Sequence, residues 1–461
     1  MNISALKEAQ EFSPAIPTSA VRAGRWDTGD DRLAKYCTAM LFFSYLFPTE
    51  AAVRIGTVMT MRRLAIIVCL VPLVIAIVRK IRHSRYVPVV SDFFIIGFAG
   101  WVPFSAFVSG GAGAVGSNLG VLAFEIFVPY LIARVLLGNA DRLLKITPIL
   151  LCTAVIMLGL GSLDTLSGEN ILGRISTQIF GNFRTVKFYG DVEVLAGSAA
   201  QYRFGLARAR GPIEHSILFG LFFVVLAPLM YFNIRRQAHR LFAMLVCALG
   251  VAIALSSAPM LLFGLVLAII LYDHLFQGLH WRWAFLLSIV IICVVVLFLI
   301  VEDPVVAFIR GFTLDPTTGM TRLEIWHWIG KNLVISPIFG VGDRDWFRPW
   351  DLLSSIDALW LVIALQYGYV GLALLIGVVL GSFFVITPRQ MFHRPMGANE
   401  RPRIAVNLAL ITFILASFTV HVWGSCWGLF GVIIGLRAGF TEALYLPSDR
   451  KPNQNICAQR V

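Results

Sequence analysis

The chain has 461 residues, of which 58% are hydrophobic and only 14% are charged. Soluble domains carry roughly 25% charged residues, so the composition excludes a soluble protein and predicts a polytopic membrane protein. The net charge of +12 is no sign of nucleic-acid binding, because loop lysines and arginines orient membrane helices and contact anionic lipid head groups.

A membrane-spanning helix needs about 20 mostly apolar residues. The sequence predicts an all-α protein with about twelve such helices between an N-terminal tail (1–32) and a C-terminal tail (441–461), so that the membrane domain covers residues 33–440. The predicted spans are 33–47, 64–78, 89–108, 116–137, 143–163, 213–234, 241–255, 259–272, 284–301, 356–386, 404–420 and 423–440.

Positive charge in short loops marks the cytoplasmic side of a membrane protein. Lysines and arginines gather in alternate loops, which places both termini in the cytoplasm. Two large loops, 164–211 and 302–355, then lie on the outer, periplasmic face, where we expect short helices. Arg54, Arg62 and Arg63 disagree with this topology, because they would also lie outside.

The end of the first large loop concentrates positive charge at the start of an apolar helix. Gly211–Pro212 predicts a helix start there, because proline at the first helical position loses no needed N–H group. The arginines predict a site that holds an anion, since a guanidinium binds phosphate oxygens in pairs. A loop that only contacts lipid phosphates is the alternative. The candidates are Arg203, Arg208, Arg210, Glu214 and His215, the last as a proton carrier or a structural histidine.

The second large loop contains Thr321-x-x-Glu324, a capping box that predicts a short helix over residues 322–333. Arg322 would then oppose the helix dipole, a costly position that favours a binding role. Five of the eleven tryptophans crowd residues 326–360, and such rings prefer the head-group layer or stack on sugars. Gly340 and Gly342 allow a tight turn with exposed N–H groups.

Two acidic residues in predicted spans, Asp357 and Glu125, each have a structural and a functional interpretation. Asp357 begins the span 356–386, where it is a helix cap or a proton acceptor. Glu125 lies within the apolar span 116–137, where an ionisable group usually faces a cavity or a partner. It is therefore an intramembrane candidate, or a protonated structural residue.

Several short motifs resemble the bacterial O-antigen polymerase and O-antigen ligase superfamily. They are Arg210-Gly211-x-x-x-His215, LSSAP (255–259), Arg322-x-x-x-Trp326 followed by Pro337-x-x-Gly340-x-Gly342, and SIDALWL (355–361) followed by YG (367–368). The resemblance implies an inner-membrane glycosyltransferase that moves a glycan from a polyprenyl pyrophosphate carrier to a sugar hydroxyl on the periplasmic face. The ligase branch has His-Asn where this chain has Ile356-Asp357, which favours a polysaccharide polymerase over a ligase.

The resemblance gives each candidate a role. We expect Arg210 and Arg322 to hold the pyrophosphate, assisted by Arg203, Arg208 or Arg344. His215 is the first candidate base, followed by Glu214 or Asp357, while Trp326, Gly340 and Gly342 complete the glycan and pyrophosphate site.

The expected partners are the lipid-linked oligosaccharide, the growing polysaccharide, membrane lipids, and flippase and chain-length regulator proteins. The resemblance implies no metal or other cofactor, and the seven cysteines form no CxxC pair that would indicate a zinc site. The rival function is a flippase for the same lipid-linked sugar, and a scaffolding membrane protein comes third. Transporters tend to show repeated halves, and no repeat is visible.

Overall fold

The computed structural model describes residues 28–55, 57–83, 86–111, 115, 122–181, 185–187, 193–195, 201–312, 316–342, 344–352, 355–386, 400–422 and 424–446. Most of the predicted tails therefore lies outside the described residues, although residues 28–32 already belong to the first described helix and residues 441–443 to the last.

Helices dominate the described chain, joined by three two-stranded antiparallel hairpins. The first half forms α2 (Thr28–Ser44), β1 (Ala52–Ile55), β2 (Thr57–Thr60), α3 (Met61–Val68), α4 (Leu70–Arg82), α5 (Val90–Gly110), η1 (Leu122–Phe127), α7 (Val128–Ile132), η2 (Ala133–Leu137), α8 (Ala140–Ser167), α9 (Ile171–Phe180), β3 (Thr185–Lys187), β4 (Glu193–Leu195), β5 (Tyr202–Arg203) and β6 (Leu206–Ala207). The second half forms α10 (Ser216–Asn233), α11 (Gln237–Ile253), α12 (Ser257–Leu275), α13 (Arg282–Ile300), α14 (Pro304–Phe312), α15 (Pro316–Ile335), α16 (Leu359–Gly381), α17 (Glu400–Ala416) and α18 (Ser425–Ala443).

Seven helical stretches of the described chain are long and apolar enough to cross a membrane: α3 with α4, α5, α8, α10, α12, α13 and α16. The protein is therefore an α-helical membrane protein. The other five predicted spans coincide with α2, η1–α7–η2, α11, α17 and α18, which do not meet the same standard of length and hydropathy. Of the predicted span 116–137, residues 116–121 lie outside the described part.

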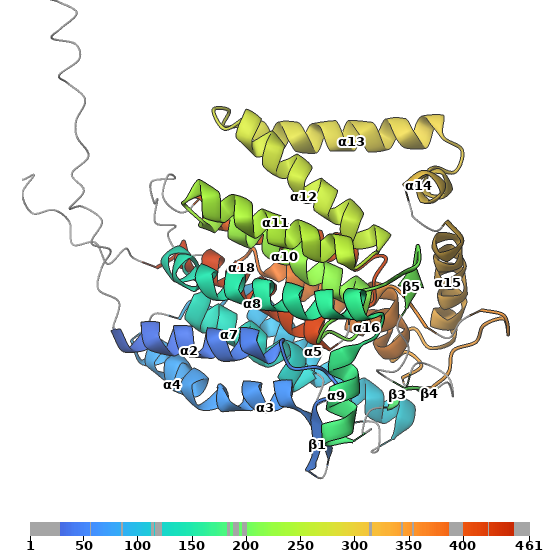
Figure 1. Cartoon of the computed structure of the whole chain (residues 1–461), viewed down its shortest axis with the longest axis horizontal. Helices are drawn as coiled ribbons and strands as arrows, with labels where there is room; N and C mark the ends of the chain where they lie inside the picture. Colours follow the sequence, from blue (N-terminus) through green and yellow to red (C-terminus); the bar gives the residue numbers. More distant parts are fainter. Residues whose placement is uncertain are drawn as a thin grey trace, which may run out of the picture.

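The long helices run side by side, and α9 and α15 lie across them at one end of the bundle (Figure 1). α10 is the central helix, with 89% of its most apolar stretch buried, whereas α13 buries 0%. Both helices are apolar on every side, so α10 belongs to a protein core and α13 to a lipid environment.

A row of glycines lets α18 approach the η1–α7–η2 segment closely. A Cβ on Gly431 would lie 2.4 Å from the Ile126 carbonyl oxygen, and one on Gly435 would lie 2.3 Å from the Tyr130 carbonyl oxygen. Small residues spaced along one helix face allow this backbone contact between membrane helices.

Two hydrophobic cores are present in the described chain. The larger fills the bundle around α10 and α18. The smaller core joins α15 to the N-terminal half of α16, and it contains Ile325, Ile329, Trp346 and Leu365. α16 contributes to both cores, so it connects the two packed units.

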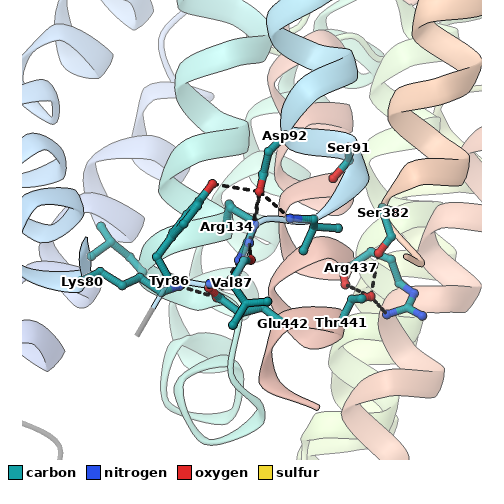
Figure 2. Close-up of polar contacts among 12 residues, drawn as sticks. Lys80, Tyr86, Val87, Ser91, Asp92, Arg134, Ser382, Arg437, Thr441 and Glu442 are labelled. Carbon is teal, nitrogen blue, oxygen red and sulfur yellow. Dashed lines mark hydrogen bonds and ion pairs between the residues drawn. The ribbon is translucent and has the colours of Figure 1, made fainter. Parts of the chain in front are cut away.

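A buried group of charges joins four helices (Figure 2), at the start of α5, whereas the loop that follows α15 contacts Ser109 near the end of α5. The side chain of Arg134 is 0% exposed and lies 2.6 Å from Glu442 and 3.2 Å from Asp92, while Lys80 also pairs with Glu442. Two cations thus meet two carboxylates, the balance that burial of charge requires. The cluster ties the end of α4, the start of α5, η2 and the end of α18 together.

Candidate functional site

α10 begins later than the sequence predicts. Its N-cap is His215, whose Nδ1 accepts a hydrogen bond from the Ile217 amide at 3.1 Å. Residues 211–214 form turns instead of the predicted first helical turn, and Gly211 adopts φ +53°. Asp164, at the end of α8, accepts hydrogen bonds from the Arg210 and Gly211 amides at 3.2 and 2.7 Å. The expected helix start at Gly211–Pro212 is therefore wrong, because Gly211 has a left-handed backbone, the chain continues in turns to Glu214, and the helix is capped by His215.

His215 stands among three of the predicted arginines. Burial, with a smaller contribution from the charges of Arg208, Arg210 and Arg322, lowers its pKa to about 3. Since Nδ1 accepts a hydrogen bond, the proton of the neutral imidazole is on Nε2. The ring therefore presents a donor, not a lone pair, at its outer nitrogen.

The two main arginines each have one carboxylate partner. Arg210 Nη2 lies 2.9 Å from Glu50 Oε1, and Arg322 Nη2 lies 3.3 Å from Asp357 Oδ2. The Nε atoms of both arginines are buried and have no hydrogen-bond partner among the described residues. Each guanidinium is therefore fixed on one side by a carboxylate and has an Nε donor that no described residue satisfies.

Arg203 and Arg208 dock the β5–β6 hairpin on the end of α11. Arg203 donates to the Leu255 carbonyl at 3.1 Å, and Arg208 donates to the Ala254 carbonyl at 3.3 Å. Leu255 opens the LSSAP motif and has φ +47°, a conformation that L residues rarely adopt. Burial and the neighbouring Arg203 lower the pKa of Arg208 to about 10. The start of the LSSAP motif and the residue before it thus bind the β5–β6 hairpin through their backbone carbonyls.

Glu214 and Glu125 join a buried ion-pair network that the sequence did not predict. Arg62 Nη2 lies 2.9 Å from Glu214 and 3.7 Å from Glu125, and Arg63 lies 3.2 Å from Glu125. Glu214 also accepts a hydrogen bond from the Ser425 amide at 3.1 Å. The sequence signals for this network were Glu125, an ionisable residue in an apolar stretch, and the conflict of Arg62 and Arg63 with the charge rule for loops.

The capping box in the second loop does not cap a helix. α15 begins at Pro316, and the Thr321 hydroxyl donates to the Thr317 carbonyl within the helix at 3.0 Å. Arg322 is therefore not at the helix start, and the expected cost against the dipole does not arise. Trp326 follows it by one turn and is 40% exposed.

Gly340 and Gly342 hold the loop against α16 instead of presenting free amides. The Val341 and Gly342 amides donate to the Leu365 and Gln366 carbonyls at 2.7 and 3.2 Å. Gly340 also donates, to Ser336 at 3.0 Å. The expectation of exposed N–H groups in this turn is therefore wrong.

α16 is interrupted at Gly368, which allows this loop to pair with its backbone. Gly368 has φ +71° and ψ −177°, and a Cβ there would lie 1.9 Å from the Ile338 carbonyl oxygen. Tyr369 donates to the Pro337 carbonyl at 2.7 Å. Arg344, in the same loop, bonds the Ser109 carbonyl at the end of α5. This contact gives Arg344 an anchoring role at the end of α5.

Comparison with known proteins adds no identification at this point. No protein-family model matches the chain, and no curated protein matches it. The chemistry of the arginine site is thus the basis on which function is argued.

Proposed function

We propose that the protein is a polysaccharide polymerase that joins oligosaccharide units carried on a polyprenyl pyrophosphate. The observation that carries the proposal is that Arg208, Arg210 and Arg322 all act electrostatically on His215, and that among the described residues the Nε atoms of Arg210 and Arg322 have no hydrogen-bond partner. A cluster of this kind favours a strongly anionic ligand such as a diphosphate.

In this reaction the donor diphosphate binds to Arg210 and Arg322, and His215 donates a hydrogen bond from Nε2. The acceptor hydroxyl attacks the anomeric carbon, the bond from that carbon to the phosphate oxygen breaks, and polyprenyl diphosphate leaves. Fixed donors stabilise the charge that grows on the leaving group, by about 3–4 kcal/mol for one donor in comparable sites.

Asp357 is the proton acceptor that the geometry favours among the three predicted candidates. Its side chain is 36% exposed, whereas Glu214 is 6% exposed and engaged with Arg62. The Nδ1 of His215 is occupied by a backbone amide. A general base must reach the proton of its substrate, and Asp357 has the exposure to do so.

We further propose about twelve crossings in the bacterial inner membrane, with both termini in the cytoplasm and the arginine site facing the periplasm. This orientation is tested in a variant without the seven native cysteines. One cysteine is introduced at a time, either as Trp350→Cys in the loop after α15 or as Gln237→Cys at the start of α11, at the opposite end of the bundle. A membrane-impermeant thiol reagent added outside the inner membrane should label the first and spare the second. The reverse pattern would overturn the proposal.

The activity is tested in a deletion strain complemented with Arg210→Ala or Arg322→Ala. Lipid-linked oligosaccharide should accumulate while polymer is lost, and normal polymer with either variant would rule the proposal out. Reconstitution in liposomes separates the alternatives: chain growth identifies a polymerase, a single transfer to another acceptor a ligase, and movement without growth a flippase.

A further inference from the structure

The segment that connects α2 to α3 reaches the arginine site from the start of the chain. It contains Glu50 and the β1–β2 hairpin, and Arg62 follows in the first turn of α3. Glu50 is 5% exposed and Arg62 is 3% exposed, so both charges are buried. A buried charge is stable only when it is paired. Glu50 pairs with Arg210 and Arg62 pairs with Glu214, and these two partners flank the turn at Gly211.

We infer that Glu50 is a positioning residue for the reaction proposed above, acting through Arg210. Its Oε1 lies 2.9 Å from Arg210 Nη2, and its Oε2 accepts a hydrogen bond from the Thr49 hydroxyl at 3.3 Å. Both carboxylate oxygens are therefore engaged, and the carboxylate holds one edge of the guanidinium. This leaves the buried Nε donor of Arg210 in a fixed direction.

Fixing this side chain before the donor binds favours turnover. A free arginine side chain samples many rotamers, and a guanidinium that is already held has lost much of that entropy before the ligand arrives. Stabilisation of a leaving group depends on donors that need no reorganisation during the reaction. Glu50 supplies that preorganisation without touching the substrate.

The same charge has an opposite effect on anion binding. Glu50 neutralises part of the positive potential of Arg210 and repels an incoming diphosphate. Its removal should therefore leave anion affinity equal or higher while it slows turnover. A general loss of structure would instead weaken both, so the two readouts separate positioning from folding.

The second connection of this segment keeps the turn in place. Glu214 lies four residues after Arg210 in the sequence. Its carboxylate accepts hydrogen bonds from Arg62 Nη2 at 2.9 Å and from the Ser425 amide at 3.1 Å. Glu50 and Arg62 therefore hold the turn at both of its ends. The inference predicts that the segment between α2 and α3 belongs to the site, although it contains none of the expected motifs.

The test uses Glu50→Gln in the full-length protein, with Glu169→Gln as the matched control. Glu169 forms an exposed ion pair with Arg174 at the same end of the bundle, where both side chains are 57% exposed. Binding is measured with inorganic pyrophosphate on the purified proteins, and turnover as polymer formed per folded protein in a complemented deletion strain. We expect Glu50→Gln to reduce polymer formation about 10-fold, because the neutral amide oxygen still accepts from Arg210 but holds the guanidinium less firmly than a carboxylate, with unchanged or tighter pyrophosphate binding. The control should change neither.

Unchanged polymer formation by Glu50→Gln would overturn the inference, as would a parallel loss of binding and turnover. The pair itself is tested apart from activity, by the unfolding of Glu50→Gln, Arg210→Gln and the double variant. Non-additive effects support the pairing, and additive effects refute it. If the effects are non-additive but Arg210→Ala still makes normal polymer, the proposed function fails while the ion pair stands.

Discussion

Arg62 Nη2 lies 2.9 Å from Glu214 Oε1, and this contact links the first turn of α3 to the residue before the N-cap of α10. The two residues are 152 positions apart in the sequence. Both side chains are buried, at 3% and 6% exposure, so neither charge is screened by solvent. The pair thus explains why Arg62 stands where the charge rule for loops does not expect an arginine.

The amide variant Glu214→Gln should retain most of the activity, because its side-chain oxygen can still accept hydrogen bonds from Arg62 and Ser425. Arg62→Ala should destabilise the protein by about 3–5 kcal/mol, because it removes the arginine that pairs with the buried Glu214 carboxylate. Denaturant unfolding in mixed micelles and polymer formation measure the two effects. The exposed Glu324→Gln on α15 is the control. Loss of all activity in a stable Glu214→Gln protein would make Glu214 the base.

The stability of the protein should depend on pH through His215. Its pKa in the fold is about 3, below the ordinary value of 6.5. The unfolded chain therefore takes up a proton below pH 6.5 while the fold does not. The contribution of neutral His215 is complete above pH 6.5 and is lost as the pH falls from 6.5 towards 3. His215→Asn keeps an N-cap acceptor without the titration, so it should lose less thermal stability between pH 6.5 and 4. An equal loss in both proteins would contradict the assignment.

Gly368→Ala should damage the junction between α16 and the preceding loop. The added Cβ would lie 1.9 Å from the Ile338 carbonyl oxygen at a backbone angle of φ +71°. The backbone strain alone should cost roughly 1–3 kcal/mol. Gly330→Ala in α15 is the matched control, because its Cβ meets nothing within 4 Å and alanine favours a helix. Unfolding measurements should show the two substitutions with opposite signs, and equal effects would refute the geometric argument.

The buried charges at the other end of the bundle should support the fold without a role in the reaction. Arg134→Met removes the cation between Asp92 and Glu442, which should cost about 3–5 kcal/mol in unfolding experiments. Lys145→Gln, whose partly exposed pair with Asp31 is near the same end, should change stability by about 0–1 kcal/mol. Polymer formed per folded molecule should stay the same in both. A selective loss of turnover in a stable Arg134→Met protein would contradict this.

Hydropathy alone predicted much of the helical framework, because length and apolar character determine which segments suit a bilayer. Helix starts were less predictable. The sequence placed the start of α10 at Gly211–Pro212, whereas the side chain of His215 sets it at Ser216. It placed the start of the second-loop helix after Thr321, whereas Pro316, a favourable first residue, starts it earlier.

The arginines of the site were visible in the sequence because they stand in unusual numbers before an apolar helix. Their carboxylate partners were not. Glu50 and Asp164 pair with Arg210 and its backbone from 160 and 46 positions away, and no local pattern reports such a contact. Glu125 stood out as a charge in an apolar stretch, but its partner Arg63 became known only from the packing of α3 against η1.

The division of the hydrophobic interior into two parts has a consequence for how the site is built. Arg322 stands on α15, which rests on the smaller core, whereas Ala209 and Ile213, on either side of Arg210, belong to the larger. The separation of the two guanidinium groups is therefore not fixed within either core, but depends on α16, which contributes residues to both. Under the proposed function, a small tilt of α15 relative to α10 would change the distance between the two arginines while the packing around α10 stays as it is.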